Sequence, residues 1–166
     1  YVVNSQDGNE GGSTFDEKKF EIRHALADWG VIWGNPTIYV EWAAKDMAPD
    51  AFEAKLLLGD ELAPRWHWGS NLVYEVETGG DREHNYEWTG GVSYTVDDEK
   101  LSIGAEFKYA MADKKQDRGN FENQLLIGPS IQYRPSPRSH IDLAPLFGVT
   151  DDSPDAKVYF IFGYEF

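Results

Sequence analysis

The chain has 166 residues, which is enough for one domain with a sizeable core and too few to favour two. It carries 29 acidic and 15 basic residues, and the formal net charge of -14 argues against nucleic acid or an anionic lipid surface as a partner of the outer face. Cysteine is absent, which excludes disulfides and thiolate metal sites.

Apolar residues recur at every second position along most of the chain, between clusters of Asp, Asn, Gly and Pro, while helical spacing is scarce. The pattern predicts nine strands, at 18–28, 37–46, 51–62, 65–77, 84–97, 99–111, 122–134, 139–149 and 157–166. Most are about ten residues long or slightly longer, close to the roughly 9 to 11 residues with which a tilted strand crosses a bilayer. The mean hydropathy of -0.54 does not exclude this, because such strands are apolar only at alternate positions.

The connections between the predicted strands differ in length. Counted back from the C-terminus, long polar connections such as TDDSPDA alternate with short turns such as RPSPR, as in outer-membrane barrels. The segment DWGVIWGNP is long where a short turn is expected, so we predict a packed turn or a small plug there. Residues 4–17 are predicted to form a flexible extracellular loop. A strand ending at Val3 would be a tenth, and we expect more chain before Tyr1.

Each predicted strand has an apolar and a polar face. A transmembrane barrel would turn the apolar face to lipid, whereas a soluble barrel or sandwich would turn it inward. Two features favour the membrane. Every second connection is long and polar, and the alternation of apolar and polar residues continues to the last residue. The polar face would then line a lumen, as a pore or a packed charge network, with the residues Glu41, Lys45, Glu53, Lys55, Arg65, His67, Glu75, Glu87, Glu106, Lys108, Arg134 and Asp142. Acidic groups outnumber basic ones on this face, which would bias a pore towards cations.

Glycines gather on the polar face. Tight turns predict that Gly59 lies opposite Gly69 and that Gly91 lies opposite Gly104. Inward glycines relieve crowding and permit the strong coiling of a small barrel, which is the interpretation we favour. The alternative is a smooth groove for a ligand or an inserted loop. Seven glycines share this parity: Gly59, Gly69, Gly91, Gly104, Gly128, Gly148 and Gly163.

Three residues conflict with uninterrupted strands. Pro129 and Pro145 lie within predicted strands, symmetrically about Pro137, and proline removes a donor from the ladder. We therefore predict a local distortion at both positions. His24 shares the parity of apolar neighbours such as Phe20, which places it on the apolar face near an interface unless the register of that strand is shifted.

The last strand, KVYFIFGYEF, resembles the C-terminal targeting signal of bacterial outer-membrane β-barrels, in which aromatic residues alternate up to a final Phe. The matching residues are Phe160, Phe162, Gly163, Tyr164 and Phe166. Segments such as GNPTIYVEW, KLLLGDELAPRWHWGSNLVYE and LLIGPSIQYRPSPRSHIDLAPLFGVT resemble Gram-negative outer-membrane proteins akin to the transporter-like family associated with phenol meta-pathway degradation. The resemblance implies the bacterial outer membrane as location, and lipid, lipopolysaccharide and the barrel-assembly machinery as partners.

The sequence offers no convincing catalytic or metal constellation. Ser139 and His140 are neighbours on opposite faces of a strand, and no serine is placed beside His67 to form a nucleophile-base pair. The histidines show no paired ligand spacing, and the acidic residues 151, 152 and 155 lack the calcium-loop pattern. We predict no enzyme activity, no metal and no cofactor; a lipid-modifying hydrolase barrel stays open.

These patterns predict an all-β fold, an antiparallel up-and-down transmembrane β-barrel that is one domain over residues 1–166 or the C-terminal portion of one. The expected function is that of a passive channel or transporter for small solutes, with no nucleic acid as partner. A closed structural or binding barrel without conductance is the second hypothesis. A soluble all-β ligand-binding barrel is the third.

Overall fold

The computed structural model describes residues 17–46, 48–80, 82–98 and 100–165. The described chain is almost entirely strand, with one short 3-10 helix, η1 (Lys115–Asp117). The strands are β1 (Glu17–Ala25), β2 (Thr37–Lys45), β3 (Ala51–Ala63), β4 (Trp66–Glu77), β5 (His84–Asp97), β6 (Leu101–Asp113), β7 (Glu122–Ser136), β8 (Ser139–Gly148) and β9 (Ala156–Tyr164). All nine predicted strands are present. The strand expected to end at Val3 and residues 4–16 of the expected loop lie outside the described residues, and Glu17 begins β1.

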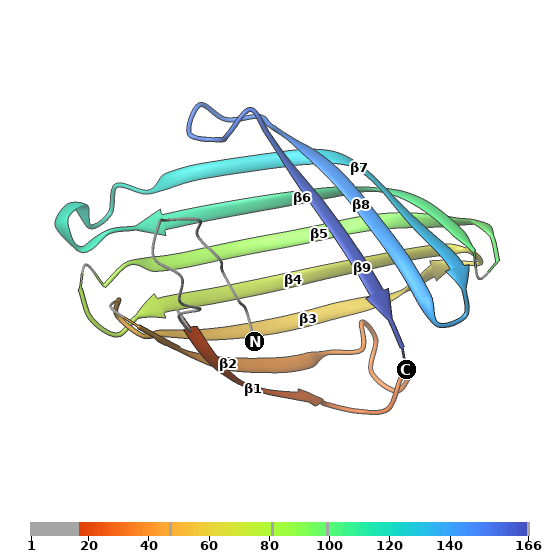
Figure 1. Cartoon of the computed structure of the whole chain (residues 1–166), viewed down its shortest axis with the longest axis horizontal. Coiled ribbons are helices and arrows are strands. Elements are labelled where there is room, and N and C mark those ends of the chain that lie inside the picture. Colours follow the sequence, from red (N-terminus) through yellow and green to blue (C-terminus); the bar gives the residue numbers. More distant parts are fainter. Residues whose placement is uncertain (1–16, 47, 81, 99, 166) are drawn as a thin grey trace, which may run out of the picture.

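The nine strands form a single antiparallel sheet whose spatial order follows the chain, from β1 to β9. The sheet curls so that β8 and β9 return across its concave side (Figure 1). Strands β1 and β9 are the two edges, and no pairing joins them among the described residues. The prediction of an all-β, antiparallel, up-and-down sheet is confirmed. No helix among the described residues is long and apolar enough to cross a membrane.

The alternation of side chains in β2 shows how the two faces of the sheet differ. Tyr39, Glu41 and Ala43 are buried, with exposed fractions of 7%, 7% and 4%. The apolar residues between them, Val40 and Trp42, are 37% and 41% exposed. The polar side chains therefore lie on the concave, inner face, and the large apolar side chains lie on the outer face.

The long connection between β1 and β2 is a packed turn against the β3 edge. Strand β2 pairs with β3 only as far as Leu57. Beyond that point the turn supplies the missing partners: the amide of Gly59 donates to the carbonyl of Gly34 (2.8 Å), and the side-chain amide of Asn35 donates to the carbonyl of Gly59 (2.8 Å). The Asp60 carboxylate accepts a bond from the Gly34 amide (3.0 Å). The turn thus extends the ladder, as the packed-turn alternative predicts.

The ladder between β7 and β8 is interrupted at the two prolines. The strands pair at Ile127–Phe147 and again at Ile131–Leu143, but no pair is formed between these points. Pro129 and Pro145 lie in this gap. Because proline has no amide proton to donate, backbone hydrogen bonds between β7 and β8 are missing at both prolines, in the same part of the ladder. The predicted distortion is confirmed.

Two details of register differ from the prediction. Gly59 lies opposite Gly69 as expected, but Gly91 lies opposite Glu106 and not opposite Gly104. The main reason is the position of the turn, because β5 still pairs at Asp97, opposite Leu101, beyond the expected turn at the two aspartates. A bulge between Thr95 and Asp97 then moves the register back by one residue. The expected tight turn at the two aspartates is therefore wrong, and β6 begins only at Leu101.

His24 pairs with Ile38 and lies on the outer face, so the register of β1 is the one that the sequence predicts. Arg65, predicted to begin a strand and to face inward, lies instead in the turn before β4 with a φ of 71°. Its guanidinium contacts Asp98 at 3.0 Å, across the turns at this end of the sheet. The side chains of Tyr94 and Asp98 raise the pKa of Arg65 above its ordinary value.

Candidate functional site

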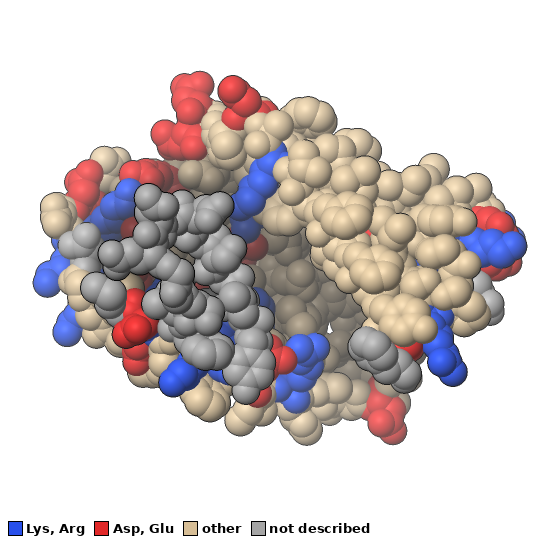
Figure 2. Space-filling model, in the orientation of Figure 1, with Lys and Arg blue, Asp and Glu red and all other residues tan. Residues whose placement is uncertain are grey.

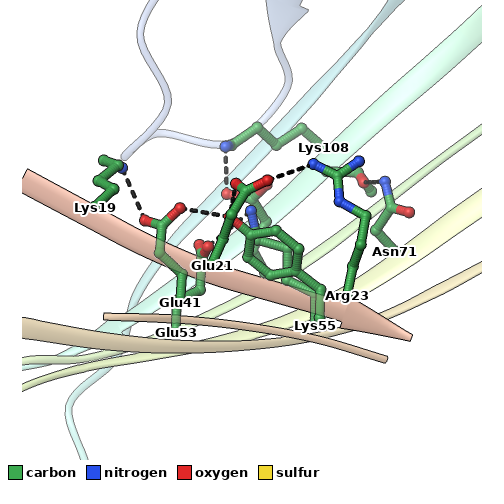
Figure 3. A network of polar contacts seen from close by, with 11 residues as sticks. Lys19, Glu21, Arg23, Glu41, Glu53, Lys55, Asn71 and Lys108 are labelled. Atoms are coloured by element: carbon green, nitrogen blue, oxygen red, sulfur yellow. Dashed lines mark hydrogen bonds and ion pairs between the residues drawn. The ribbon is translucent and has the colours of Figure 1, made fainter. Parts of the chain in front are cut away.

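A network of charged side chains covers the inner face of β1 to β3 (Figure 3). The ammonium group of Lys19 donates to the Glu41 carboxylate at 2.9 Å, and Glu41 also accepts a bond from the hydroxyl of Tyr39. The same hydroxyl contacts Glu21 at 2.9 Å, and Arg23 donates to Glu21 at 2.7 Å. Glu41 is thereby held by two partners although it is buried.

The network exists because the register brings carboxylates together. Glu21 lies opposite Glu41, Glu41 opposite Glu53, and Glu53 opposite Glu75, so one row of four carboxylates crosses four neighbouring strands. Like charges in directly opposite positions repel. Basic groups from adjacent rows offset this repulsion: Lys55 contacts Glu53 at 2.7 Å.

A second part of the inner face, on β4 to β6, carries further polar pairs. Lys108 forms an ion pair with Glu87, and the side-chain amide of Asn71 donates to the Thr89 hydroxyl at 3.0 Å. These pairs lie in the same view as the first network (Figure 3). The inner face is thus lined by charges that are mostly paired with one another.

Beside these networks the inner face is hollow. Two adjoining cavities of about 460 Å³ and 490 Å³ are lined by β4 to β9. Figure 2 shows the molecule hollowed next to the broad tan surface over β8 and β9. Five residues line both cavities and define the neck between them: His67, Ser93, Glu106, Ser130 and Tyr159.

Three polar groups at the neck lack a partner. The hydroxyl of Tyr159 is buried without a hydrogen bond among the described residues. Over the same part of the chain, the side chains of His67 and Glu106 have no hydrogen-bond or ion-pair partner. The stem of Glu106 lies over Gly91, where an added Cβ would come within 2.8 Å of the Glu106 Cγ. Glycine at position 91 therefore leaves room for the side chain of Glu106 to lie along the wall of the cavity.

An apolar cluster on β7 to β9 lies beside the cavities. Leu126, Ala144 and Leu146 are buried together, with Tyr159 packed against them. The sequence pattern did not predict this cluster, because its members occupy positions that are otherwise polar along each strand. The pairing of β7 with β8 and of β8 with β9 brings them together.

The structure divides the predicted lumen residues among three places. Glu41, Glu53, Lys55 and Glu75 lie in the carboxylate row and its network, and Lys45 lies at the end of β2 on the same parity. The others, except Arg65 in its turn, line the cavities: His67, Glu87, Glu106, Lys108, Arg134 and Asp142. The prediction missed several polar residues of the inner face, although their parity already indicated this face: Lys19, Glu21, Arg23 and Tyr39 in the network, and Ser93 and Ser130 at the neck.

The Ser-His-Asp combination on β8 does not form a nucleophile-base pair. Ser139 shares a hydrogen bond with Ser136 (2.7 Å), whereas His140 contacts Asp142 at 3.4 Å on the other face of the strand. Among the described residues, no group of three or more His, Asp or Glu side chains could hold a metal ion.

The terminal strand β9 keeps its alternation. Val158, Phe160, Phe162 and Tyr164 are exposed on the outer face, whereas Tyr159 lines the cavities. Gly163 lies under the ring of His140, which a Cβ at this position would overlap. Phe166 lies outside the described residues.

Among curated proteins, none matches the chain. A family model described as "Putative MetA-pathway of phenol degradation" matches residues 39–166. This match begins in β2 and includes both cavities, and it extends over well more than half of the chain. The protein therefore belongs to this phenol-degradation family.

Proposed function

We propose that this protein is a β-barrel of the bacterial outer membrane, or the C-terminal portion of one, and that it acts as a passive channel for small solutes. One observation carries the proposal: the strands turn their large apolar side chains outward and their charged side chains inward around two cavities. This orientation suits a sheet with lipid outside and water inside.

The exposed side chains of the outer face support the proposal that this face contacts lipid. Apolar and aromatic side chains are exposed on every strand, including Ile22 on β1, Trp88 on β5 and Phe160 on β9. A face of this extent in water would be an aggregation liability. A soluble barrel needs the opposite arrangement, with the aromatic face packed inside.

The inner face supports the passage of solutes. The cavities lie side by side, and the residues of the neck offer hydroxyl, imidazole and carboxylate groups rather than a hydrophobic plug. The family description concerns phenol degradation, so phenol is one solute to test. No arrangement described above favours catalysis, and we propose none.

The exposed aromatic stripe of β9 supports assembly by the barrel-assembly machinery, with lipid and lipopolysaccharide as neighbours of the outer face. In this proposal Phe160, Phe162 and Tyr164 are the side chains that the machinery reads. Gly163 lets β9 pack closely on β8 at His140.

Two measurements test the proposal. The protein should partition into detergent and should change its gel mobility on heating, and a monomer that stays soluble without detergent would refute the membrane assignment. Reconstituted in planar bilayers, the protein should give discrete conductance steps, which buffer and detergent controls should lack.

A closed barrel without conductance is the second candidate, and the charge network favours it. Paired charges on β1 to β3 occupy part of the inner face, and narrow barrels fill their interiors in this way. A protein that inserts, shows heat-modifiable mobility and yet never conducts would support this candidate over the channel.

A further inference from the structure

Glu106 has an unusual place among the charges of the inner face. It lies on β6 opposite Gly91 on one side and Gly128 on the other, so no bulky side chain flanks it in its own row. It lines both cavities. Any solute that moves from one cavity to the other therefore passes this carboxylate.

The other acidic groups that line the cavities have side-chain partners. Lys108 is paired with Glu87, and Asp142 accepts a bond from Gln132 at 2.7 Å and contacts His140 at 3.4 Å. Glu106 has no such partner among the described residues. The neck therefore carries one uncompensated negative charge.

The one opposing feature is Arg134, whose side chain also has no partner among the described residues. It lines one cavity only. Along β7 it lies six residues from Gly128, the partner of Glu106, which corresponds to roughly 20 Å of strand. That distance exceeds the screening length of about 8 Å at physiological ionic strength, so Arg134 does not neutralise the neck.

We propose that Glu106 is the specificity-determining residue of the channel and that it favours small cations, both inorganic ions and organic ammonium compounds, over anions. This inference rests on the proposed channel function. The carboxylate supplies the attraction. The hydroxyl groups of Ser93, Ser130 and Tyr159 can accept hydrogen bonds from an ammonium group or replace part of the hydration shell of a metal cation.

The buried hydroxyl of Tyr159 is an independent indication of a ligand at this point. A buried polar group without a partner is destabilising relative to a satisfied one. The Tyr159 hydroxyl has no partner among the described residues, and Tyr159 lines both cavities. A solute or water at the neck would satisfy it.

The test is the reversal potential of single channels in planar bilayers of neutral lipid under a gradient of KCl, and then of tetramethylammonium chloride. The wild-type protein should prefer the cation in both salts. Glu106→Gln keeps the shape of the side chain and removes the charge, and it should lower the cation-to-anion permeability ratio about thirtyfold. One unit charge about 4 Å away in water changes the permeability of each ion about fivefold, in opposite directions for the cation and the anion.

Two control variants show whether the effect is specific to position 106. Glu75→Gln removes a carboxylate from the same inner face outside the cavities, and it should leave the ratio within about twofold of the wild type. Arg134→Gln removes a charge that lies beyond the screening length, so it should change the ratio much less than Glu106→Gln does. Heat-modifiable gel mobility checks that each variant is folded.

The outcomes separate this inference from the proposed function. A folded wild-type protein that never conducts refutes the channel itself. A channel whose ratio is unchanged in Glu106→Gln, or changes equally in Glu75→Gln, refutes the role of Glu106 and leaves the channel standing.

Discussion

Leu72 tests whether the outer face meets lipid. It lies in the middle of β4, 48% exposed, between Leu56 on β3 and Trp88 on β5. Leu72→Arg places a charge at the centre of this apolar surface. At a bilayer midplane such a charge costs about 2–4 kcal/mol of folding free energy, whereas on a water-facing surface the change stays within about 0.5 kcal/mol.

Leu62 provides the matched control. It is 57% exposed near the end of β3, six residues beyond Leu56, or roughly 20 Å along the strand. Near an interface the same substitution costs only about 0–1 kcal/mol. The free energy of unfolding should be measured by tryptophan fluorescence during guanidinium titration of protein reconstituted in phosphatidylcholine vesicles. A cost below about 0.5 kcal/mol for Leu72→Arg, or an equal cost at both positions, would refute lipid contact at Leu72.

Three further substitutions, two of them with a matched control variant, test the packing by the shift of the unfolding midpoint in the same vesicles. Gly128→Ala should destabilise by about 1–3 kcal/mol because its Cβ would overlap the backbone of β8, whereas Gly69→Ala, with only one carbonyl oxygen within reach at 3.8 Å, should change little. Asp60→Ala removes the acceptor that holds the packed turn and should cost about 1–2 kcal/mol, with faster hydrogen exchange in residues 28–36. Glu41→Ala should cost about 1–3 kcal/mol because it removes the buried carboxylate that accepts from both Tyr39 and Lys19, and Lys19→Met, at the exposed end of the same ion pair, should cost less than half as much.

Alternation was sufficient to predict most of the fold. The period of two fixes which side chains share a face, so Glu41 and Val40 could be assigned to opposite faces without a structure. Proline likewise has a direct physical consequence, and the break at Pro129 and Pro145 followed from the missing donors.

Register at the turns could not be predicted in the same way. The pairing of β5 with β6 depends on where the turn lies and on the bulge before it, and the alternation within each strand reports neither, so the position of Gly91 opposite Glu106 could not be predicted. The positive φ of Arg65 is likewise set by the local geometry of its turn and could not be predicted from the alternation. The neck could not be predicted either, because Glu106 and Tyr159 belong to strands that are brought together only by the curl of the sheet.

The order of the strands has a consequence for how the chain reaches this structure. Every strand pairs only with the strands before and after it in the chain, and the longest connection between paired strands spans residues 26–36. Each pairing therefore closes a short loop, and the entropic penalty is divided into eight small steps rather than one large one. Folding can proceed hairpin by hairpin, with low contact order for an all-β protein. The same locality means that a hairpin could be inserted or deleted during evolution without breaking the pairing of the remaining strands.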